Sequence, residues 1–176
     1  ALGSLARDSR FWALSLVILL WNFPPFLGTA QFYYQTTHLG LGPKFIGLLS
    51  TIGGLAGMLG AACYGKFEGR TWSVESIARA AVLVGAPLSL LYLFYRGPVS
   101  AVLLTALFGF SGVFFRLSLM DLAARSCPAF AEATAFAAFM AVFNISAYAS
   151  NTTGGKLYDA LTRSFGAYEA AACLML

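Results

Sequence analysis

Residues 98–120 read PVSAVLLTALFGFSGVFFRLSLM, a run of 23 residues whose single charged member is Arg116. About 20 consecutive apolar residues in helical form match the hydrocarbon thickness of roughly 30 Å in a bilayer. A single apolar span in lipid has to pair its own backbone N–H and C=O groups, which an α-helix does. The stretch therefore predicts a transmembrane helix.

Five further segments have the same apolar character. In chain order, with residues 98–120 as segment D, they are segment A (11–36), B (45–65), C (76–95), E (129–155) and F (from 167). Short turns connect them, and no stretch has the composition of a domain linker. We expect an all-α integral membrane protein in which residues 1–176 form a single six-helix transmembrane bundle.

The composition argues against an ordinary soluble domain. Charged residues make up 10% of the chain and apolar residues 59%, with a mean hydropathy of +0.76, whereas soluble domains carry about 25% charged residues. The net charge of +4 comes from basic residues at the ends of apolar runs. Because such residues orient helices, we expect no nucleic-acid partner.

No motif of an enzyme or a metal site is present in the sequence. There is a single histidine, and the three cysteines are isolated, without metal-ligand spacing. A nucleophile elbow, a zinc-protease motif and a phosphate loop are all missing. We therefore expect neither an enzyme nor a bound metal or cofactor.

The distribution of Lys and Arg predicts the orientation. Seven such residues lie on the side of the N-terminus and four on the other side. The first group comprises Arg7, Arg10, Lys66, Arg70, Arg79, Arg116 and Arg125, and the second Lys44, Arg96, Lys156 and Arg163. Since basic residues favour the cytoplasmic face, we expect a multi-pass protein of the cell membrane with its N-terminal end in the cytoplasm.

Segment E carries a polar stripe. Asn144, Tyr148 and Asn151 stand at i, i+4 and i+7, on one face of a helix. Polar groups inside a membrane need a partner or water. The stripe indicates either hydrogen bonding between helices or the lining of an aqueous cavity, and the spacing does not decide between them.

Segment A contains Pro24 and Pro25 near its middle. Because proline has no N–H, the carbonyls of Leu20 and Trp21 lose their helical partners, which predicts a bend. Asn22 either donates to such a freed carbonyl or belongs to an unwound stretch that binds a ligand. Further along segment A, two glutamines share another face and are also candidates for the cavity; they are Gln31 and Gln35.

Charged residues enter segments D and E. Arg116 lies 18 residues beyond Pro98, about 27 Å along a helix, so it either reaches the headgroups or binds a substrate. Asp121 and Arg125 are spaced to form an i, i+4 pair. Glu132 favours the positive end of a helix dipole, and it is also placed to carry a proton or to pair with Arg116.

Two segments predict packing rather than chemistry. Segment B has Gly53, Gly57, Ala61 and Gly65 at intervals of four, a row of small residues against which another helix can pack closely. Segment C has a cation near one end, and near the other it has two tyrosines that we interpret as an aromatic belt, so segment C is expected to face lipid.

Three groups of residues together carry a resemblance. They are residues 25–34 with 39–40 and 45–47; residues 60–64; and the set Cys127-Pro128, Glu132-Ala133-Thr134, Phe136-Ala137, Met140, Asn144 and Gly154. This pattern resembles the folate–biopterin transporter family and, more broadly, the C-terminal half of a major facilitator superfamily transporter. The loop after segment B departs from the superfamily, because Lys66-Phe67 stands where Asp-Arg is usual, although Gly69-Arg70 remains.

The resemblance implies a fold and a function. Segments A to F would be helices seven to twelve of a twelve-helix transporter, with the last one truncated, and their partner would be the N-terminal six-helix half. The absence of an initiator Met and an end inside segment F agree with a fragment. Alternating-access transport of small organic solutes is expected, with folate- or pterin-like anions as the narrower interpretation. The alternative is a channel or scaffold subunit without a transport cycle.

Overall fold

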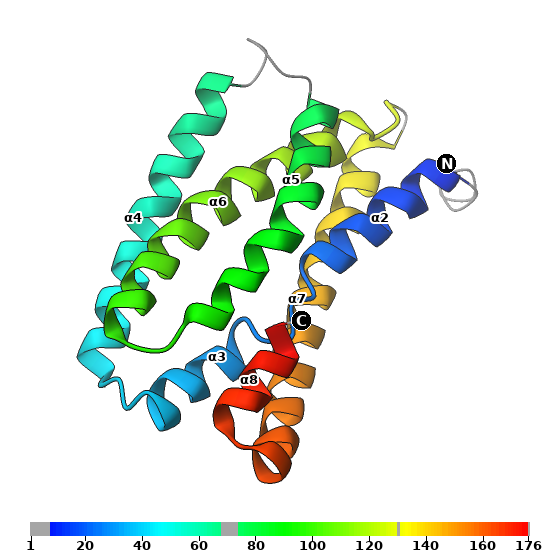
Figure 1. Ribbon diagram of the computed structural model, residues 1–176. Helices are drawn as coiled ribbons and strands as arrows, with labels where there is room; N and C mark the ends of the chain where they lie inside the picture. Colours follow the sequence, from blue (N-terminus) through cyan, green and yellow to red (C-terminus); the bar gives the residue numbers. More distant parts are fainter. Residues whose placement is uncertain (1–7, 68–73, 130, 176) are drawn as a thin grey trace.

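The computed structural model describes residues 8–67, 74–129 and 131–175 (Figure 1). Its elements are α-helical except for η1, a π-helix, and η2, a 3₁₀-helix. In chain order they are α2 (Ser9–Trp21), α3 (Thr29–Tyr33), η1 (Tyr34–His38), α4 (Pro43–Phe67), α5 (Val74–Ser89), η2 (Leu90–Phe94), α6 (Pro98–Arg125), α7 (Glu132–Phe165) and α8 (Ala167–Met175).

Three helices in the described ranges are long and apolar enough to cross a membrane by themselves. They are α4, α6 and α7, with mean hydropathies of 1.7, 1.9 and 1.4 in their most apolar windows. These helices correspond to segments B, D and E, and with the shorter apolar helices α2 and α5–η2 they make the chain a multi-pass membrane protein. Three of the six predicted spans are thus confirmed as long apolar helices, and the count of six is not.

Segment E is longer than its sequence suggests. Its helix begins at Glu132 and continues to Phe165, ten residues beyond the predicted end at position 155. Gly154 and Gly155 lie within it, and both are buried in the contact with segment A. The helix ends instead at Gly166, whose φ of +100° suits a glycine after a helix end.

Segment A is broken, as its two prolines predict. Helix α2 ends at Trp21, and the next helix, α3, begins only at Thr29. The π-helical turn η1 follows directly, so the second half of the segment consists of two short pieces. A straight helix through residues 20–28 is therefore ruled out, and the lost backbone hydrogen bonds have to be replaced from elsewhere.

Helices α4 and α6 pack backbone against backbone, side by side in Figure 1. A methyl group added at Gly109 would lie 2.5 Å from the carbonyl oxygen of Gly53. A methyl group at Gly57 would lie 2.8 Å from a methyl carbon of Val113, and one at Gly60 would overlap the carbonyl oxygen of Phe110. The predicted row of small residues is thus a helix contact at positions 53 and 57, whereas Gly65 meets nothing.

Segment C differs from its prediction. It contains Pro87, and it tightens into η2 before it ends. Tyr92 and Tyr95 are buried in the core against Phe26 and Tyr34, so the interpretation as an aromatic belt at the lipid interface is wrong. The turn expected at residues 68–70, with the charge-bearing loop around it, lies outside the described residues.

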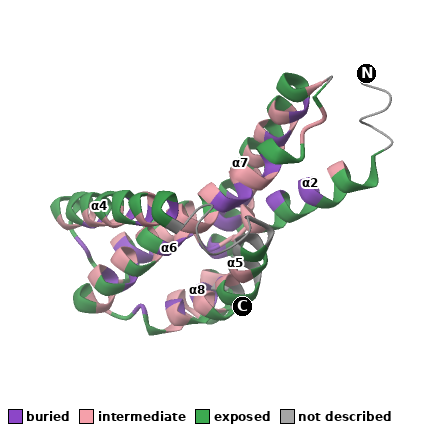
Figure 2. Ribbon diagram, turned by 90° about the horizontal axis from the view of Figure 1, so that it is seen from above, coloured by how far each residue is buried: buried purple, intermediate pink, exposed green. Residues whose placement is uncertain are grey.

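The helices pack as two pairs, and further helices contact each pair. One pair is α4 with α6, and α5 packs against α6. The other joins α2 and α3 to α7, while α8 contacts α7, η1 and η2. Exposed residues dominate the outer face of α4 (Figure 2), where Leu48, Leu55, Met58 and Leu59 are each at least half exposed. Such a surface suits lipid rather than water.

The α4–α6 contact predicts a position-specific effect of alanine. Gly109→Ala is expected to lower the free energy of unfolding by about 1–3 kcal/mol, because the new methyl group forces two backbones apart. Gly112→Ala on the same helix meets no atom within 4 Å and should be neutral or slightly stabilising. Thermal unfolding in mild detergent measures both, and equal stability of the two variants would contradict the close contact.

Candidate functional site

The break in segment A is closed by serines of α7. Ser146 Oγ donates to the carbonyl of Leu19 at 2.6 Å, and Ser150 Oγ donates to the carbonyl of Pro24 at 2.8 Å. Both serines are buried and stand one helical turn apart. The two serines thereby pair backbone carbonyls at the break across helices, and the Pro24 carbonyl also accepts from the backbone N–H of Leu27 at 3.1 Å.

Asn151 holds the other side of the same break. Its Oδ1 accepts from the backbone N–H of Thr29 at 3.3 Å, and its Nδ2 donates to the carbonyl of Ala147. Gly28, which precedes α3, has a φ of +88° and no side chain with which to cap that helix. Asn151 supplies the cap from α7 instead, and Gly28 leaves room for it.

Gly154 completes this contact, because a methyl group there would overlap the carbonyl oxygen of Pro25. We call the set Ser146, Ser150, Asn151 and Gly154 the α7 clamp. Our reading of the sequence singled out Asn151 and missed both serines. Their signal was available, since serines one turn apart lie in the same helix as the amides and the two prolines leave carbonyls free.

Asn22 and Arg116 line one small cavity between α2, α6 and α7. The cavity has a volume of about 10 Å³, and its other walls are Ile18, Leu119, Met120, Met140 and Phe143. Asn22 Nδ2 donates to the carbonyl of Ile18 at 2.9 Å, and not to the carbonyl of Leu20 or Trp21, which was one of the two alternatives. The structure therefore brings together one amide and one cation that are almost a hundred residues apart in the chain.

Arg116 is held by an aromatic ring. The carbon at the centre of its guanidinium lies 4.2 Å from the centroid of the Phe143 ring. A cation over an aromatic face is favourable by about 0.5–2 kcal/mol and leaves the guanidinium N–H groups at the edge free to donate. Arg116 remains exposed in the described chain, so its charge is accessible at one side of the cavity.

Gln31 and Gln35 belong to a different cluster. Gln35 is buried, and its Nε2 donates to the Tyr95 hydroxyl at 2.5 Å; Gln31 also interacts with that hydroxyl. The Tyr34 hydroxyl donates to the carbonyl of Tyr95 at 3.0 Å. These bonds tie segment A to the end of segment C, where a 3₁₀-helix leaves carbonyls unpaired.

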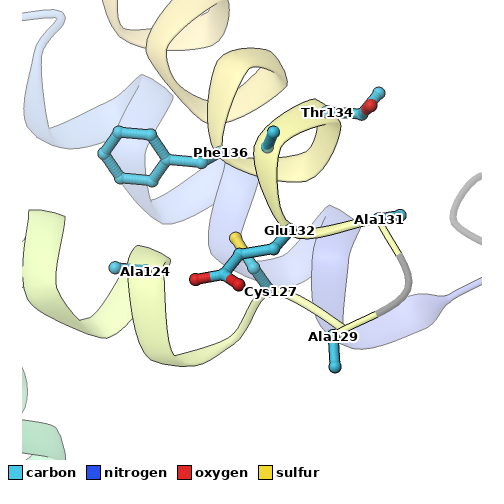
Figure 3. A pocket seen from close by; sticks show the side chains of 8 residues that line it. Ala124, Cys127, Ala129, Ala131, Glu132, Thr134 and Phe136 are labelled. Atoms are coloured by element: carbon cyan, nitrogen blue, oxygen red, sulfur yellow. The ribbon is translucent and has the colours of Figure 1, made fainter.

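Glu132 lies apart from Arg116, at the turn between α6 and α7. It lines an open pocket of about 660 Å³, and its carboxylate extends toward Ala124, beside Cys127 (Figure 3). Among the described residues, no ion pair joins Glu132 to Arg116. Burial raises the pKa of the Cys127 thiol, and the nearby Glu132 adds to the rise, so this thiol is a poor nucleophile at neutral pH.

The predicted pair at the end of α6 is confirmed. Arg125 Nε and Asp121 Oδ1 are 3.0 Å apart, and the Tyr64 hydroxyl donates to Asp121 Oδ2 at 3.0 Å. The carboxylate therefore joins α4 to α6. Because Arg125 is more than half exposed, the ion pair itself contributes little to stability.

Asn144 and Tyr148 stay exposed on the outer face of α7. Tyr148 is 74% exposed, whereas the α7 clamp is on the opposite side of the helix or at its edge. The predicted stripe is thus divided, since Asn151 bonds to segment A and the other two residues point away from the described helices.

Comparison with known proteins agrees with this picture. The chain is similar to a transporter. It is 28% identical over 165 aligned residues to the folate–biopterin transporter of Synechocystis sp. (strain ATCC 27184 / PCC 6803 / Kazusa). The alignment covers 86% of this chain and 32% of that protein, so the chain spans about a third of the length of its curated relative. No family model and no solved structure matches the chain.

The α7 clamp predicts which serines of α7 stabilise the fold. Ser146→Ala and Ser150→Ala should each lower the free energy of unfolding by about 0.5–2 kcal/mol, because each removes a hydrogen bond between a buried serine of α7 and the backbone of segment A. Ser164→Ala is the matched control, since Ser164 is exposed and contacts only a carbonyl of its own helix. Thermal unfolding in mild detergent distinguishes them, and a control as damaging as the clamp variants would refute the assignment.

Proposed function

We propose that this chain is part of a secondary active transporter that moves small organic anions across the membrane by alternating access. The observation that carries the proposal is the cavity in which Asn22 and Arg116 meet at the junction of three membrane segments. A cation inside a membrane protein is costly and is placed where it serves a pathway or a substrate. Its similarity to a folate–biopterin transporter points to folate- or pterin-like anions as the substrate class.

The position of Arg116 supports anion binding over simple snorkelling. It lies nine residues before the end of α6, about 14 Å along the helix. Its guanidinium is over Phe143 of α7 rather than directed along α6 to the headgroups. A planar guanidinium with free edge N–H groups binds a carboxylate through two parallel hydrogen bonds. Asn22 contributes an amide oxygen, which accepts from an N–H of the solute.

Two contacts between helices agree with an inverted repeat in which segments A to C exchange with D to F, although the contact of α7 with α8 has no comparable counterpart between the described residues of α4 and α5. Exchanging A with D and B with E turns the contact of α4 with α6 into the contact of segment A with α7, and both are observed. The same exchange turns the contact of α5 with α6 into the contact of α8 with η1. Such internal repeats are usual in secondary transporters, with the substrate site at the repeat interface.

The exposed stripe of α7 supports a second half of the transporter as partner. Asn144 and Tyr148 are polar groups on a membrane-crossing helix, and lipid is a poor solvent for them. The curated relative is about three times as long as the aligned region. We place the aqueous pathway along this stripe, between the present bundle and an N-terminal six-helix half.

Arg116 is expected to be essential for uptake. Arg116→Gln in the protein expressed in full should lower uptake of radiolabelled folate at least about tenfold, because a charged hydrogen bond to the anion is worth about 1.5–3 kcal/mol. Arg163→Gln, at an exposed site on α7, is the control and should transport like the wild type. Wild-type uptake by the Arg116→Gln protein would exclude this anion site.

Cysteine labelling tests the proposed pathway. With Cys63, Cys127 and Cys173 replaced by alanine, Asn144→Cys and Tyr148→Cys should react with a small water-soluble thiol reagent. Leu83→Cys, on α5 at 74% exposure, should react much more slowly because it faces lipid. If the three positions label at the same rate, α7 does not line an aqueous pathway.

A further inference from the structure

The Phe143 ring of α7 lies between an apolar cluster and a charge. It is half-buried, and it packs against the buried cluster that contains Ile18 and Phe139. The carbon at the centre of the Arg116 guanidinium lies 4.2 Å from the centroid of the same ring. An aliphatic side chain of similar volume would fill this place in the cluster, so packing alone does not call for an aromatic ring here.

The ring is the contact that fixes the Arg116 guanidinium. In the ranges that the structure describes, no hydrogen bond or ion pair holds this group. Asp121, five residues further along α6, is bonded to Arg125 and to the Tyr64 hydroxyl, and Glu132 lies apart at the turn after α6. An exposed arginine without a partner samples many rotamers. The Phe143 ring therefore decides where this charge is held.

The α7 clamp in turn fixes the place of the ring. Phe143 stands three residues before Ser146, whose hydroxyl donates to the carbonyl of Leu19. Since residues three apart are neighbours on the surface of a helix, this bond sets the part of α7 that carries Phe143 against segment A. The ring then lines the cavity together with Ile18 and Asn22. One line of contacts thus runs from the break in segment A through the clamp and the ring to the cation.

We propose that Phe143 is a positioning residue for the anion site: its ring holds the Arg116 guanidinium at the cavity with N–H groups free for the carboxylate of the solute. A group that is already held in place loses less conformational entropy on binding than one that the ligand has to order. The ring therefore raises the affinity for the anion without contacting it. The identity of the anion rests on the proposed function, whereas the hold of the ring on Arg116 is tested independently of it.

A series of fluorinated rings tests this role without a change of shape. In the protein expressed in full, phenylalanine with one, two or three ring fluorines replaces Phe143. Fluorine draws electron density from the ring face, so each addition weakens the attraction for a cation. The folate concentration that gives half-maximal uptake should rise stepwise, by at least about threefold over the series, at an unchanged maximal rate. A constant half-saturating concentration would overturn the proposal.

The matched control is the same series at Phe139. This residue stands one turn before Phe143 on α7, is fully buried, and contacts the ring of Phe11 at a centroid distance of 4.7 Å instead of a cation. Fluorination of Phe139 should leave the half-saturating concentration of folate unchanged. An equal rise in both series would assign the effect to packing and refute a specific role of Phe143.

Modification of arginine reports on the hold of the ring without transport. Phenylglyoxal reacts with guanidine groups, and mass spectrometry of the digested protein gives the rate at each site. Arg116 should react at least about threefold faster with the trifluorinated ring than with the natural one, because the guanidinium is released. Arg125, on the same helix and paired with Asp121, should keep its rate. A constant rate at Arg116 would refute the proposal.

The two measurements separate the proposal from the proposed function. Faster modification of Arg116 with an unchanged half-saturating concentration of folate overturns the positioning role and leaves the transport of folate intact. Absence of folate uptake by the wild-type protein refutes the substrate class instead, and the modification rate of Arg116 then decides whether Phe143 holds the cation.

Discussion

The rest of the structure depends on the pairing of backbone groups at the break in segment A, which contains Pro24 and Pro25. In water such groups would be hydrated, but within a bilayer each unpaired group costs several kcal/mol. The α7 clamp removes that cost by placing two serines and one amide against the break. Segment A can therefore be interrupted in the membrane only because α7 runs beside it with small polar residues in the right register.

The hydrogen bonds between segment A and α7 also differ in kind from the contacts that hold the other helices. A helix with two prolines is often regarded as a flexible element, yet here its break is anchored to α7 by three hydrogen bonds. The α4–α6 pair is held in another way, through glycines that allow close approach of the two backbones. Between these two pairs, Asn22 and Arg116 line a small cavity with Phe143, and elsewhere the Tyr34 hydroxyl donates to the Tyr95 carbonyl.

The polar residues of the chain fall into groups with different tasks. Tyr34 and Gln35 of segment A donate to the carbonyl and hydroxyl of Tyr95, at the end of segment C, inside the core. Serines and Asn151 on α7 support the break. Arg116, like Arg96, contacts an aromatic ring, but it lines the cavity with Asn22, where a cation is suited to a ligand that comes and goes. The resemblance to a folate–biopterin transporter agrees with this division of roles.

The sequence by itself determined the class of protein, the long apolar helices in segments B, D and E, the break at Pro24 and Pro25, and the pair of Asp121 with Arg125. These features are local, since each follows from hydropathy, from a missing N–H or from helical spacing. Only the tertiary structure decided that Gly154 and Gly155 lie within a helix, that Tyr92 and Tyr95 are buried, and that Asn22 shares a cavity with Arg116. Those outcomes depend on which helices become neighbours, and spacing along one helix carries no information about the face that another helix presents to it.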